Sequence, residues 1–530
     1  MKLFIDLIKR SLPLAIVLGG GVAHGQALPA CVAALPCKLN AGLGPLAFAN
    51  FQTLLAPNNE RVVFVHATES ADPRVLYSVR FTGGAPVRLS VPTIDRIYDV
   101  DISPDSTRVV YSASEPGSSA RHLFSVPIAG PASANIRLAD EAPTRALISP
   151  DSRKVVFRPA AGDRLRVVPI EGPANAGARL TAPMVAGGQM GAFKITADSR
   201  SVIYHADQET DGVFELFRVP LTLSPQPDPP TVKLNGPLPD GGDVVSFQVP
   251  SIDGPIVYLA DQITNNVNEL FSVRAGGAGR VRLNATVPSG MQISDTGCLG
   301  SGCFGWFIAP GGKRVVFELE GFPPGGFDRQ LHSVPIAGGT PVRLDADFSL
   351  TEVIAYLISP DGNRITYSMG DGETNDKATF SVPVVGPASA GVQVTETSEQ
   401  GDLVAFTADS SRVLWMPPNI SPAQFMSTPI AGPLSQAVEI SGNEDPRFLS
   451  VSSASRQRVI YSAQAPGQSK LDVFSVPQAG NGTRFNLSGS IGDRGLFIGQ
   501  LFMSNNGAYV VYAAETADGH FNLWASGVLQ

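Results

Sequence analysis

The chain has 530 residues, which exceeds the roughly 250 to 300 residues that one hydrophobic core usually serves, so several cores or a repeated unit are expected. Its 54 glycines and 44 prolines indicate many turns between short elements. The formal net charge of −8, without a stripe of Lys and Arg, excludes nucleic acid as an expected partner because such a chain repels phosphate backbones.

The first 25 residues have the pattern of a secretory signal peptide. A basic segment leads into the apolar run Leu12 to Ala23, and the small-residue motif Ala23-His24-Gly25 follows as a cleavage site. The run is too short to cross a bilayer, which takes about 20 residues, and no other segment looks transmembrane. A lipoprotein signal ending at Cys31 is the weaker alternative. We therefore expect a signal peptide over 1–25 and a periplasmic or secreted protein over 26–530.

Four cysteines form two close pairs, Cys31 with Cys37 and Cys298 with Cys303. Export to an oxidising compartment favours disulfides, and the glycines of the loop CLGSGC let its two cysteines approach each other. Two local disulfides are therefore expected. A shared four-cysteine zinc site is the alternative, although zinc ribbons usually have two residues between the cysteines of a pair.

A repeat of about 50 residues fills the rest of the chain. Each copy has an apolar first strand ending in Ser or Thr, a tight turn such as SPDS, and a β-branched second strand such as RVVYSA. A third strand such as HLFSVP and a short closing strand such as IRLA follow. The ten second strands fall at 61–67, 108–113, 154–159, 201–206, 255–260, 314–319, 364–369, 412–417, 458–463 and 509–514.

Four short strands per copy predict an all-β propeller, because one four-stranded sheet of this size cannot bury both faces unless it stacks on its neighbours. The pattern SPDG…RITYS…FSVPV resembles the propeller repeats of TolB and related WD-repeat-like bacterial periplasmic proteins. This resemblance covers residues 36–530. It implies a propeller and, by analogy, an envelope interaction module. Unlike TolB, the chain shows no separate N-terminal domain.

The two ends of the chain predict how the ring closes. The last copy stops after its third strand, while CKLN at 37–40 matches the closing sequence VKLN at 232–235. The N-terminal strand is therefore expected to complete the tenth blade of a single ring and to remove an open sheet edge. Two rings of five, divided at segment 285–304, are the alternative, but sealed rings would not need to share one blade between the first and last copies.

Catalytic and metal-binding signatures are missing from the sequence: it has no Gly-x-Ser-x-Gly elbow, no Walker loop and no His-Glu-x-x-His motif. His66 and His205 take the same place in copies one and four, which are not neighbours, so we expect no metal site there. We also expect no cofactor. The turn aspartates share one position and are expected to bond their own backbone. They are Asp105, Asp151, Asp198, Asp361 and Asp409.

The first strand of each copy is expected to line the central channel. Two residues before its terminal Ser or Thr, charge occurs only at Asp101 and Lys194, and two positions earlier Asp99 and Arg145 are charged on the same strand face. These four residues come from three adjacent blades and form our candidate binding site. The alternative interpretation is a patch of ion pairs wetted by channel water.

The leading functional hypothesis is a monomeric, non-catalytic propeller of the periplasm or the exterior that binds a protein or an envelope polymer. The alternative is a hydrolase or lyase that acts on a sugar or a lactone at the channel mouth with the same four residues.

Overall fold

The computed structural model describes most of the chain after residue 35; the predicted signal peptide and Cys31 lie outside the described residues. The described segments are 36–46, 52–67, 73–140, 143–160, 164–224, 230–295, 297–299, 302–323, 327–345, 351–371, 377–397, 402–417, 423–453, 455–465, 467, 471–489, 498–515 and 521–528.

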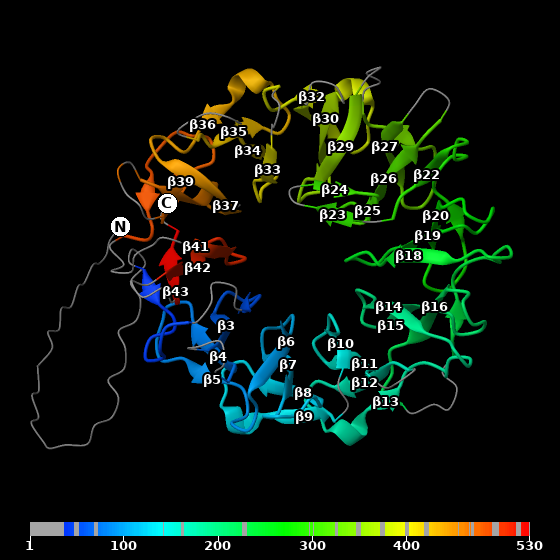
Figure 1. The fold of residues 1–530 in the computed structure, drawn as a ribbon, viewed down its shortest axis with the longest axis horizontal. Coiled ribbons are helices and arrows are strands. Elements are labelled where there is room, and N and C mark those ends of the chain that lie inside the picture. The colour runs from blue at the N-terminus through cyan, green and yellow to red at the C-terminus, as the bar shows by residue number, and fades with distance from the viewer. Residues whose placement is uncertain are drawn as a thin grey trace, which may run out of the picture.

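Ten antiparallel sheets stand around a central axis and form one ring (Figure 1). Eight of these blades have four strands, one has five and one has six. The predicted all-β propeller of ten blades is therefore confirmed. The expectation that the first strand of each copy is innermost is also confirmed, since β6, β10, β14 and β18 face the middle of the ring (Figure 1).

Blades 1 to 5 follow the repeat in chain order. Blade 1 has β2 (Thr53–Leu55), β3 (Arg61–His66), β4 (Val75–Arg80) and β5 (Val87–Arg88). Blade 2 has β6 (Arg96–Ile102), β7 (Arg108–Ser114), β8 (Arg121–Pro127) and β9 (Ile136–Ala139). Blade 3 has β10 (Pro143–Ile148), β11 (Lys154–Pro159), β12 (Arg166–Pro169) and β13 (Ala178–Arg179). Blade 4 has β14 (Met190–Ile195), β15 (Ser201–Ala206), β16 (Glu215–Pro220) and β17 (Val232–Lys233). Blade 5 has β18 (Val244–Gln248), β19 (Ile256–Ala260), β20 (Glu269–Val273) and β21 (Val281–Arg282).

Blades 8 to 10 return to the same pattern. Blade 8 has β33 (Asp402–Phe406), β34 (Arg412–Met416), β35 (Met426–Pro429) and β36 (Val438–Glu439). Blade 9 has β37 (Asp445–Ser453), β38 (Arg458–Gln464), β39 (Leu471–Pro477) and β40 (Phe485–Asn486). Blade 10 has β41 (Ile498–Met503), β42 (Tyr509–Glu515), β43 (Phe521–Gly527) and β1 (Cys37–Lys38). Short 3₁₀ helices precede some closing strands: η1 (Ala132–Ala134), η2 (Ala174–Ala176), η3 (Ala388–Ala390) and η4 (Leu434–Gln436).

Blades 6 and 7 depart from the repeat. Blade 6 has β25 (Trp306–Ile308), β26 (Arg314–Gly321), β27 (Asp328–Pro335) and β28 (Val342–Arg343), and β22 (Met291–Ile293) joins the far end of β26. Blade 7 has β29 (Thr351–Ile358), β30 (Arg364–Asp371), β31 (Lys377–Pro383) and β32 (Val392–Gln393). The hairpin β23 (Gly297–Leu299) and β24 (Gly302–Phe304) adds to the inner edge of blade 7 through β29.

Each second strand is apolar on both faces because each face packs against a different neighbouring blade. In β7, Val109 and Tyr111 join the cluster shared with blade 1, while Val110 joins the cluster shared with blade 3. One such cluster of buried residues lies at each of the ten interfaces among the described blades. Burial on both faces explains why the second strands read as continuous apolar runs rather than as alternating patterns.

A side-chain hydrogen bond between Arg and Ser, buried or half-buried, ties the second strand to the third in most blades. In blade 2 the Arg108 Nε donates to the Ser125 Oγ at 2.7 Å. Blade 4 exchanges the two residue types, and the Arg218 Nε on the third strand donates to the Ser201 Oγ on the second at 2.8 Å. The Arg at the start of RVVYSA and the Ser of HLFSVP are therefore partners, which explains why the repeat retains both.

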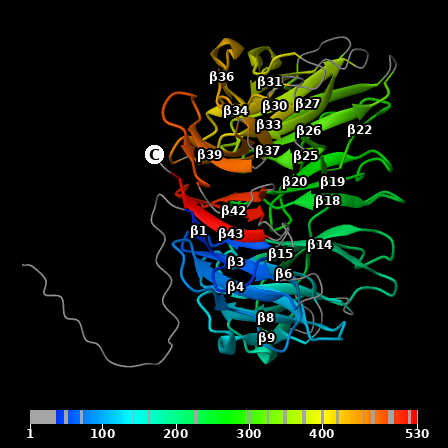
Figure 2. The same ribbon diagram turned by 60° about the vertical axis from the view of Figure 1, so that its left-hand side comes forward.

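The ring closes where the N-terminal strand meets the last one. Lys38 pairs with Trp524 in the register of β1 and β43, and the Leu39 N–H donates to the Leu523 carbonyl at 2.7 Å. The Asn40 Oδ1 accepts the Leu523 N–H at 3.1 Å. The predicted closure is confirmed, and Figure 2 shows β1 beside β43.

The alternative prediction of two five-bladed rings is wrong, because blades 5, 6 and 7 pack against one another in unbroken order. Val257 of blade 5 and Trp306 of blade 6 share one buried cluster, and Val316 of blade 6 shares the next with Tyr356 of blade 7. Segment 285–304 does not divide the ring. It is an insertion that adds β22 to the sheet of blade 6 and the hairpin β23–β24 to the sheet of blade 7.

No helix among the described residues is long and apolar enough to cross a membrane.

Candidate functional site

A cavity of about 230 Å³ lies between the inner parts of blades 2 and 3, and it gathers three of the four predicted site residues. Asp99 and Asp101 come from β6, and Arg145 comes from β10. The other lining residues are Val100, Val110, Tyr111, Ser112, Leu123, Ala146 and Ile148. The charged side chains thus stand on a wall that is otherwise largely apolar.

A β-bulge in β6 presents the acidic side of this cavity. Ile97 pairs with Ala113 and Val100 pairs with Tyr111, so two residues of β6 oppose one residue of β7. The Ser112 Oγ donates to the Asp99 Oδ2 at 3.0 Å and accepts the Asp99 N–H at 3.2 Å. Ser112 therefore fixes both the backbone and the carboxylate of Asp99 at the bulge.

Asp101 lies two residues further along β6, on the same exposed face as Asp99. Its carboxylate is accessible to solvent but lies recessed among cavity atoms, and this burial raises the pKa of Asp101. The Ile102 N–H donates to the Asp101 Oδ1 at 2.9 Å, which opposes that rise in pKa without cancelling it. Asp101 therefore holds a proton more readily than an ordinary surface aspartate.

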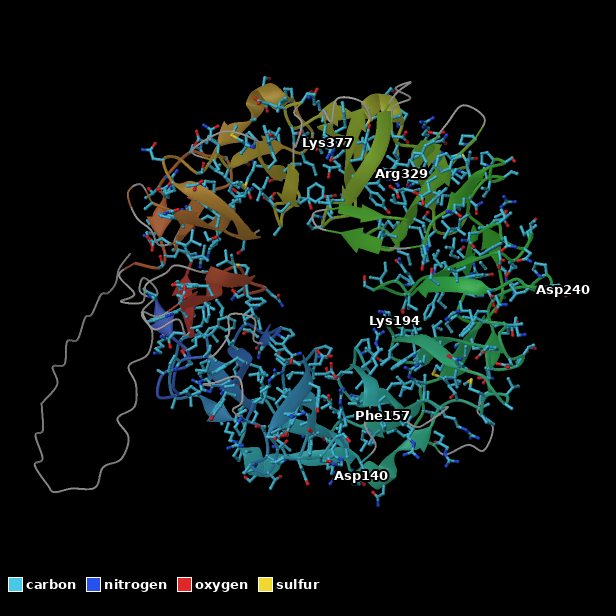
Figure 3. All side chains as sticks on the ribbon, viewed as in Figure 1. Asp140, Phe157, Lys194, Asp240, Arg329 and Lys377 are labelled. Carbon is cyan, nitrogen blue, oxygen red and sulfur yellow. The ribbon has the colours of Figure 1, made fainter. Side chains whose placement is uncertain are left out.

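The basic side of the cluster spans blades 3 and 4. The Arg145 guanidinium lies 5.8 Å from the centre of the Phe193 ring. Burial, and then the positive charge of Arg145, lower the pKa of Lys194. Both cations are exposed, and Lys194 is labelled at the edge of the opening in Figure 3.

No ion pair in the described parts of blades 2 to 4 joins Asp99 or Asp101 to Arg145 or Lys194. The acids lie on blade 2 and the cations on blades 3 and 4, so the cluster separates opposite charges. Its role in binding stays a prediction. The alternative interpretation, a patch of ion pairs wetted by channel water, stays open as well.

The turn aspartates have the structural role that their common position predicts. The Asp105 Oδ1 accepts the Ser103 hydroxyl at 2.6 Å and the Thr107 N–H at 3.0 Å. Burial alone would raise the pKa of Asp105, but these hydrogen bonds outweigh it and lower the pKa. The Asp105 N–H also donates to the Ser152 Oγ of blade 3 at 3.0 Å, so the turn links neighbouring blades.

His66 and His205 do not occupy equivalent positions, which corrects the sequence-based prediction. His66 ends β3, whereas His205 is the next-to-last residue of β15. The His66 Nε2 bonds the Gly44 carbonyl at 2.8 Å, and the His205 Nε2 bonds the Val244 carbonyl at 2.6 Å. Within the described segments, no group of three or more His, Cys, Asp or Glu residues could hold a metal ion.

Cys298 and Cys303 face each other across the hairpin β23–β24. Directly opposed residues in an antiparallel pair lie about 4.5 to 5.5 Å apart at Cα, which a disulfide can span. This disulfide stays a prediction, as does the disulfide between Cys31 and Cys37, because Cys31 lies outside the described residues.

Glu318 is a buried acid that the motif search missed. It is fully buried on β26, where the Gly305 N–H donates to its Oε2 at 2.9 Å, and burial raises its pKa to about 7. Gly305 joins the channel-side strand β24 to the inner strand β25. In the sequence, Glu318 of RVVFEL stands at the repeat position that Ser112 occupies in RVVYSA. A charged residue inside an otherwise apolar strand was the signal that could have revealed this site.

No family model matches the sequence, and no curated protein matches it. The chain is similar to a structure from a study of two prolyl endopeptidases, with a TM-score of 0.37, 11% identity and coverage of 72% of this chain and 55% of that chain. Apo prolyl oligopeptidase B from Galerina marginata gives a TM-score of 0.37 and 10% identity, with 72% and 56% covered. The chain spans just over half the length of these structures. The fold assignment rests on the strand pairing above, not on these similarities.

Proposed function

We propose that the protein is a non-catalytic binding propeller that holds a protein or an envelope polymer through the cluster Asp99, Asp101, Arg145 and Lys194. The observation that carries this proposal is the separation of exposed charges: the two acids of blade 2 share one cavity with Arg145 of blade 3, and Lys194 of blade 4 lies close enough to Arg145 for the two positive charges to interact. Exposed charges that form no ion pair with one another among the described residues remain available to charged groups of a ligand.

The proposed partner carries groups of both signs, because one acidic and one basic patch lie side by side. The apolar wall that includes Val110, Leu123 and Ile148 offers contact area between them. A charged segment of a protein or of an envelope polymer has this combination, whereas a simple anion would use only the basic side. The TolB-like pattern and the predicted signal peptide support a site of action in the periplasm or outside the cell, with the protein acting as a monomer.

The test is a cross-linking pull-down from the cell envelope of the native host, comparing the wild type with Asp99→Ala/Lys194→Ala. We expect the double variant to recover at least about tenfold less partner than the wild type. Each charge contact of this kind contributes on the order of 1 to 2 kcal/mol to the binding free energy. The matched control is Arg137→Ala/Asp140→Ala, which removes one cation and one acid from the outer edge of blade 2, where Figure 3 labels Asp140.

Equal recovery by the double variant and the wild type would overturn the proposal. Equal losses in the inner and the outer double variant would also overturn it, because the effect would then not belong to the cluster.

A second candidate function is acid–base catalysis on a sugar or a lactone. Burial raises the pKa of Asp101 and lowers the pKa of Lys194, so both groups are displaced toward the range in which general acids and bases work. Turnover of any lactone or glycoside substrate by the wild type, abolished by Asp101→Asn, would favour this candidate. Binding of a polymer without turnover favours the first.

A further inference from the structure

A second cavity, of about 480 Å³, lies beside the strands that extend blade 6. β22 pairs with the far end of β26, so that Gln292 faces Glu320, and Glu320 in turn faces Arg329 on β27. These three strands lie side by side in Figures 1 and 2. The cavity belongs to the insertion and is separate from the charged cluster of blades 2 to 4.

Two glycines allow the close approach of β22 and β26. A Cβ on Gly321 would lie 2.0 Å from the Gly290 carbonyl oxygen, and a Cβ on Gly290 would lie 2.5 Å from the Phe322 carbonyl oxygen. The Phe322 N–H donates to the Gly290 carbonyl at 2.8 Å. The extension therefore has a specific backbone arrangement that side chains at these two positions would prevent.

The extension, formed by β22 and the far ends of β26 and β27, gathers polar and aromatic side chains on one face. Side chains two residues apart on a strand, or directly opposed across strands, share a face, so Gln292, Glu320 and Arg329 lie together with Phe322 and Phe327. All five line the cavity, and Asn266 from a loop of blade 5 lines it as well.

The two aromatic rings form the apolar part of this face. Phe322 is 74% exposed, a larger fraction than for any other large apolar side chain among the described residues. Its ring contacts the Phe327 ring edge to face, with centroids 5.1 Å apart. The Arg329 guanidinium lies 5.5 Å from the centre of the Phe327 ring. The two rings and the guanidinium thus form one accessible aromatic surface.

The polar part of the face carries no net charge. The Arg329 Nη2 and Nε both donate to the Glu320 Oε2, at 2.8 and 3.2 Å, and the Ser294 hydroxyl donates to the Glu320 Oε1. Beside this ion pair stand the side-chain amides of Gln292 and Asn266. The groups are planar and hold both donors and acceptors at fixed positions.

We propose that this cavity is a binding site for a neutral carbohydrate. Vicinal hydroxyls both donate and accept, which matches amides and a neutralised ion pair, while the C–H face of a pyranose covers an exposed ring. A phosphate or an acidic ligand would need an unpaired cation, and Arg329 already has its carboxylate partner. The volume lies within the roughly 300 to 1,000 Å³ of small-molecule sites.

The experiment is titration calorimetry of the full chain with neutral hexasaccharides of glucose, mannose, galactose and N-acetylglucosamine, and with a mixed set of uncharged hexapeptides as the competing class. We expect at least one hexasaccharide to bind, and Phe322→Ala and Gln292→Ala each to weaken it at least about tenfold. Phe322→Tyr keeps the ring and should retain the affinity. Val385→Ala is the matched control, since Val385 is an exposed apolar residue that is 60% exposed on blade 7.

Three results would overturn the proposal: no hexasaccharide binds at millimolar concentration, binding survives Phe322→Ala and Gln292→Ala, or only the peptides bind. Because Phe322 is exposed, its removal should leave the melting temperature unchanged, and this measurement separates lost binding from lost folding. Asp99→Ala/Lys194→Ala should leave carbohydrate binding intact, so this site and the proposed function of the channel cluster can fail independently.

Discussion

Blades 2 and 6 place different residues at the same repeat position, the fifth residue of the second strand, and use them to support the innermost strand. In blade 2 this residue is Ser112, which bonds Asp99 at the bulge of β6. In blade 6 it is Glu318, which bonds the Gly305 N–H where the inserted hairpin returns to the blade. A small hydroxyl is enough where the backbone follows the repeat. The insertion in blade 6 instead depends on a buried carboxyl group.

The largest expected difference between these blades is a pH dependence carried by Glu318. Burial raises its folded pKa to about 7, so its stabilising contribution is fully present below its unfolded pKa and is lost as the pH rises through about 7. Between the unfolded pKa and the folded pKa, the free energy of unfolding of the wild type should fall by on the order of 3 kcal/mol relative to that of Glu318→Gln. This follows from about 1.4 kcal/mol per pKa unit.

Urea unfolding of both proteins from pH 4 to pH 8 measures this loss. Parallel pH profiles for wild type and Glu318→Gln would show that Glu318 does not titrate in this range. Ser125→Ala serves as the control in blade 2, because Ser125 bonds the Arg108 guanidinium, which does not titrate between pH 4 and pH 8, so this change should lower stability by the same amount at every pH.

The close approach of β22 and β26 makes the extension of blade 6 sensitive to a single added methyl group. Gly321→Ala should destabilise the protein by about 1 to 3 kcal/mol, because the new Cβ would meet the Gly290 carbonyl in a close-packed strand pair. Hydrogen exchange should show the loss at 291–293 first, since among the described strands β22 forms strand pairing with β26 alone. Gly276→Ala is the control, because nothing lies within 4 Å of its added Cβ.

The third prediction tests what the two blades have in common. Ser125→Ala in blade 2 and Ser333→Ala in blade 6 each remove the acceptor of an Arg Nε–H, at 2.7 Å in both blades. Each substitution should lower the free energy of unfolding by about 1 to 2 kcal/mol, because the Arg Nε–H loses its acceptor. Chemical denaturation measures both, and clearly unequal costs would mean that the insertion has changed the second and third strands of blade 6 as well.

The smallest effect is expected at Asp101 on the inner wall. Because its folded pKa is raised, its charged form is disfavoured in the folded protein, and Asp101→Asn should be slightly more stable than the wild type at pH 7. The difference should vanish as the pH falls below the unfolded pKa of Asp101. Asp99→Asn is the comparison in the same strand. A variant less stable than the wild type at pH 7 would contradict the assignment of burial as the cause.

The sequence allowed the regular part of the molecule to be predicted because ten copies repeat the same residues. The order of the four strands, the SPD turn and the match between CKLN and VKLN could therefore be recognised without coordinates, whereas the bond between the Arg of the second strand and the Ser of the third was seen only in the structure. The cluster of Asp99, Asp101 and Arg145 could be predicted because it depends only on strand alternation within these copies.

The insertion could not be placed in the same way. Segment 285–304 occurs once, and its contacts with β26 and β29 depend on tertiary packing that no repeat encodes. The aromatic pair Phe322 and Phe327 was overlooked for this reason. The bulge near Asp99 was also missed, because a two-for-one pairing leaves no mark in the alternation of side chains.

The meeting of β1 with β43 has a consequence for biosynthesis. Leu39 and Leu46 are buried against the region of Leu523, yet they are made almost 500 residues earlier. While the chain emerges from the ribosome or a translocation pore, this segment can already pack against Phe64 and Phe81 of blade 1, but its strand pairing has to wait for β43. Among the described strands, β1 is therefore the earliest in the chain and yet one of the last to find its sheet partner.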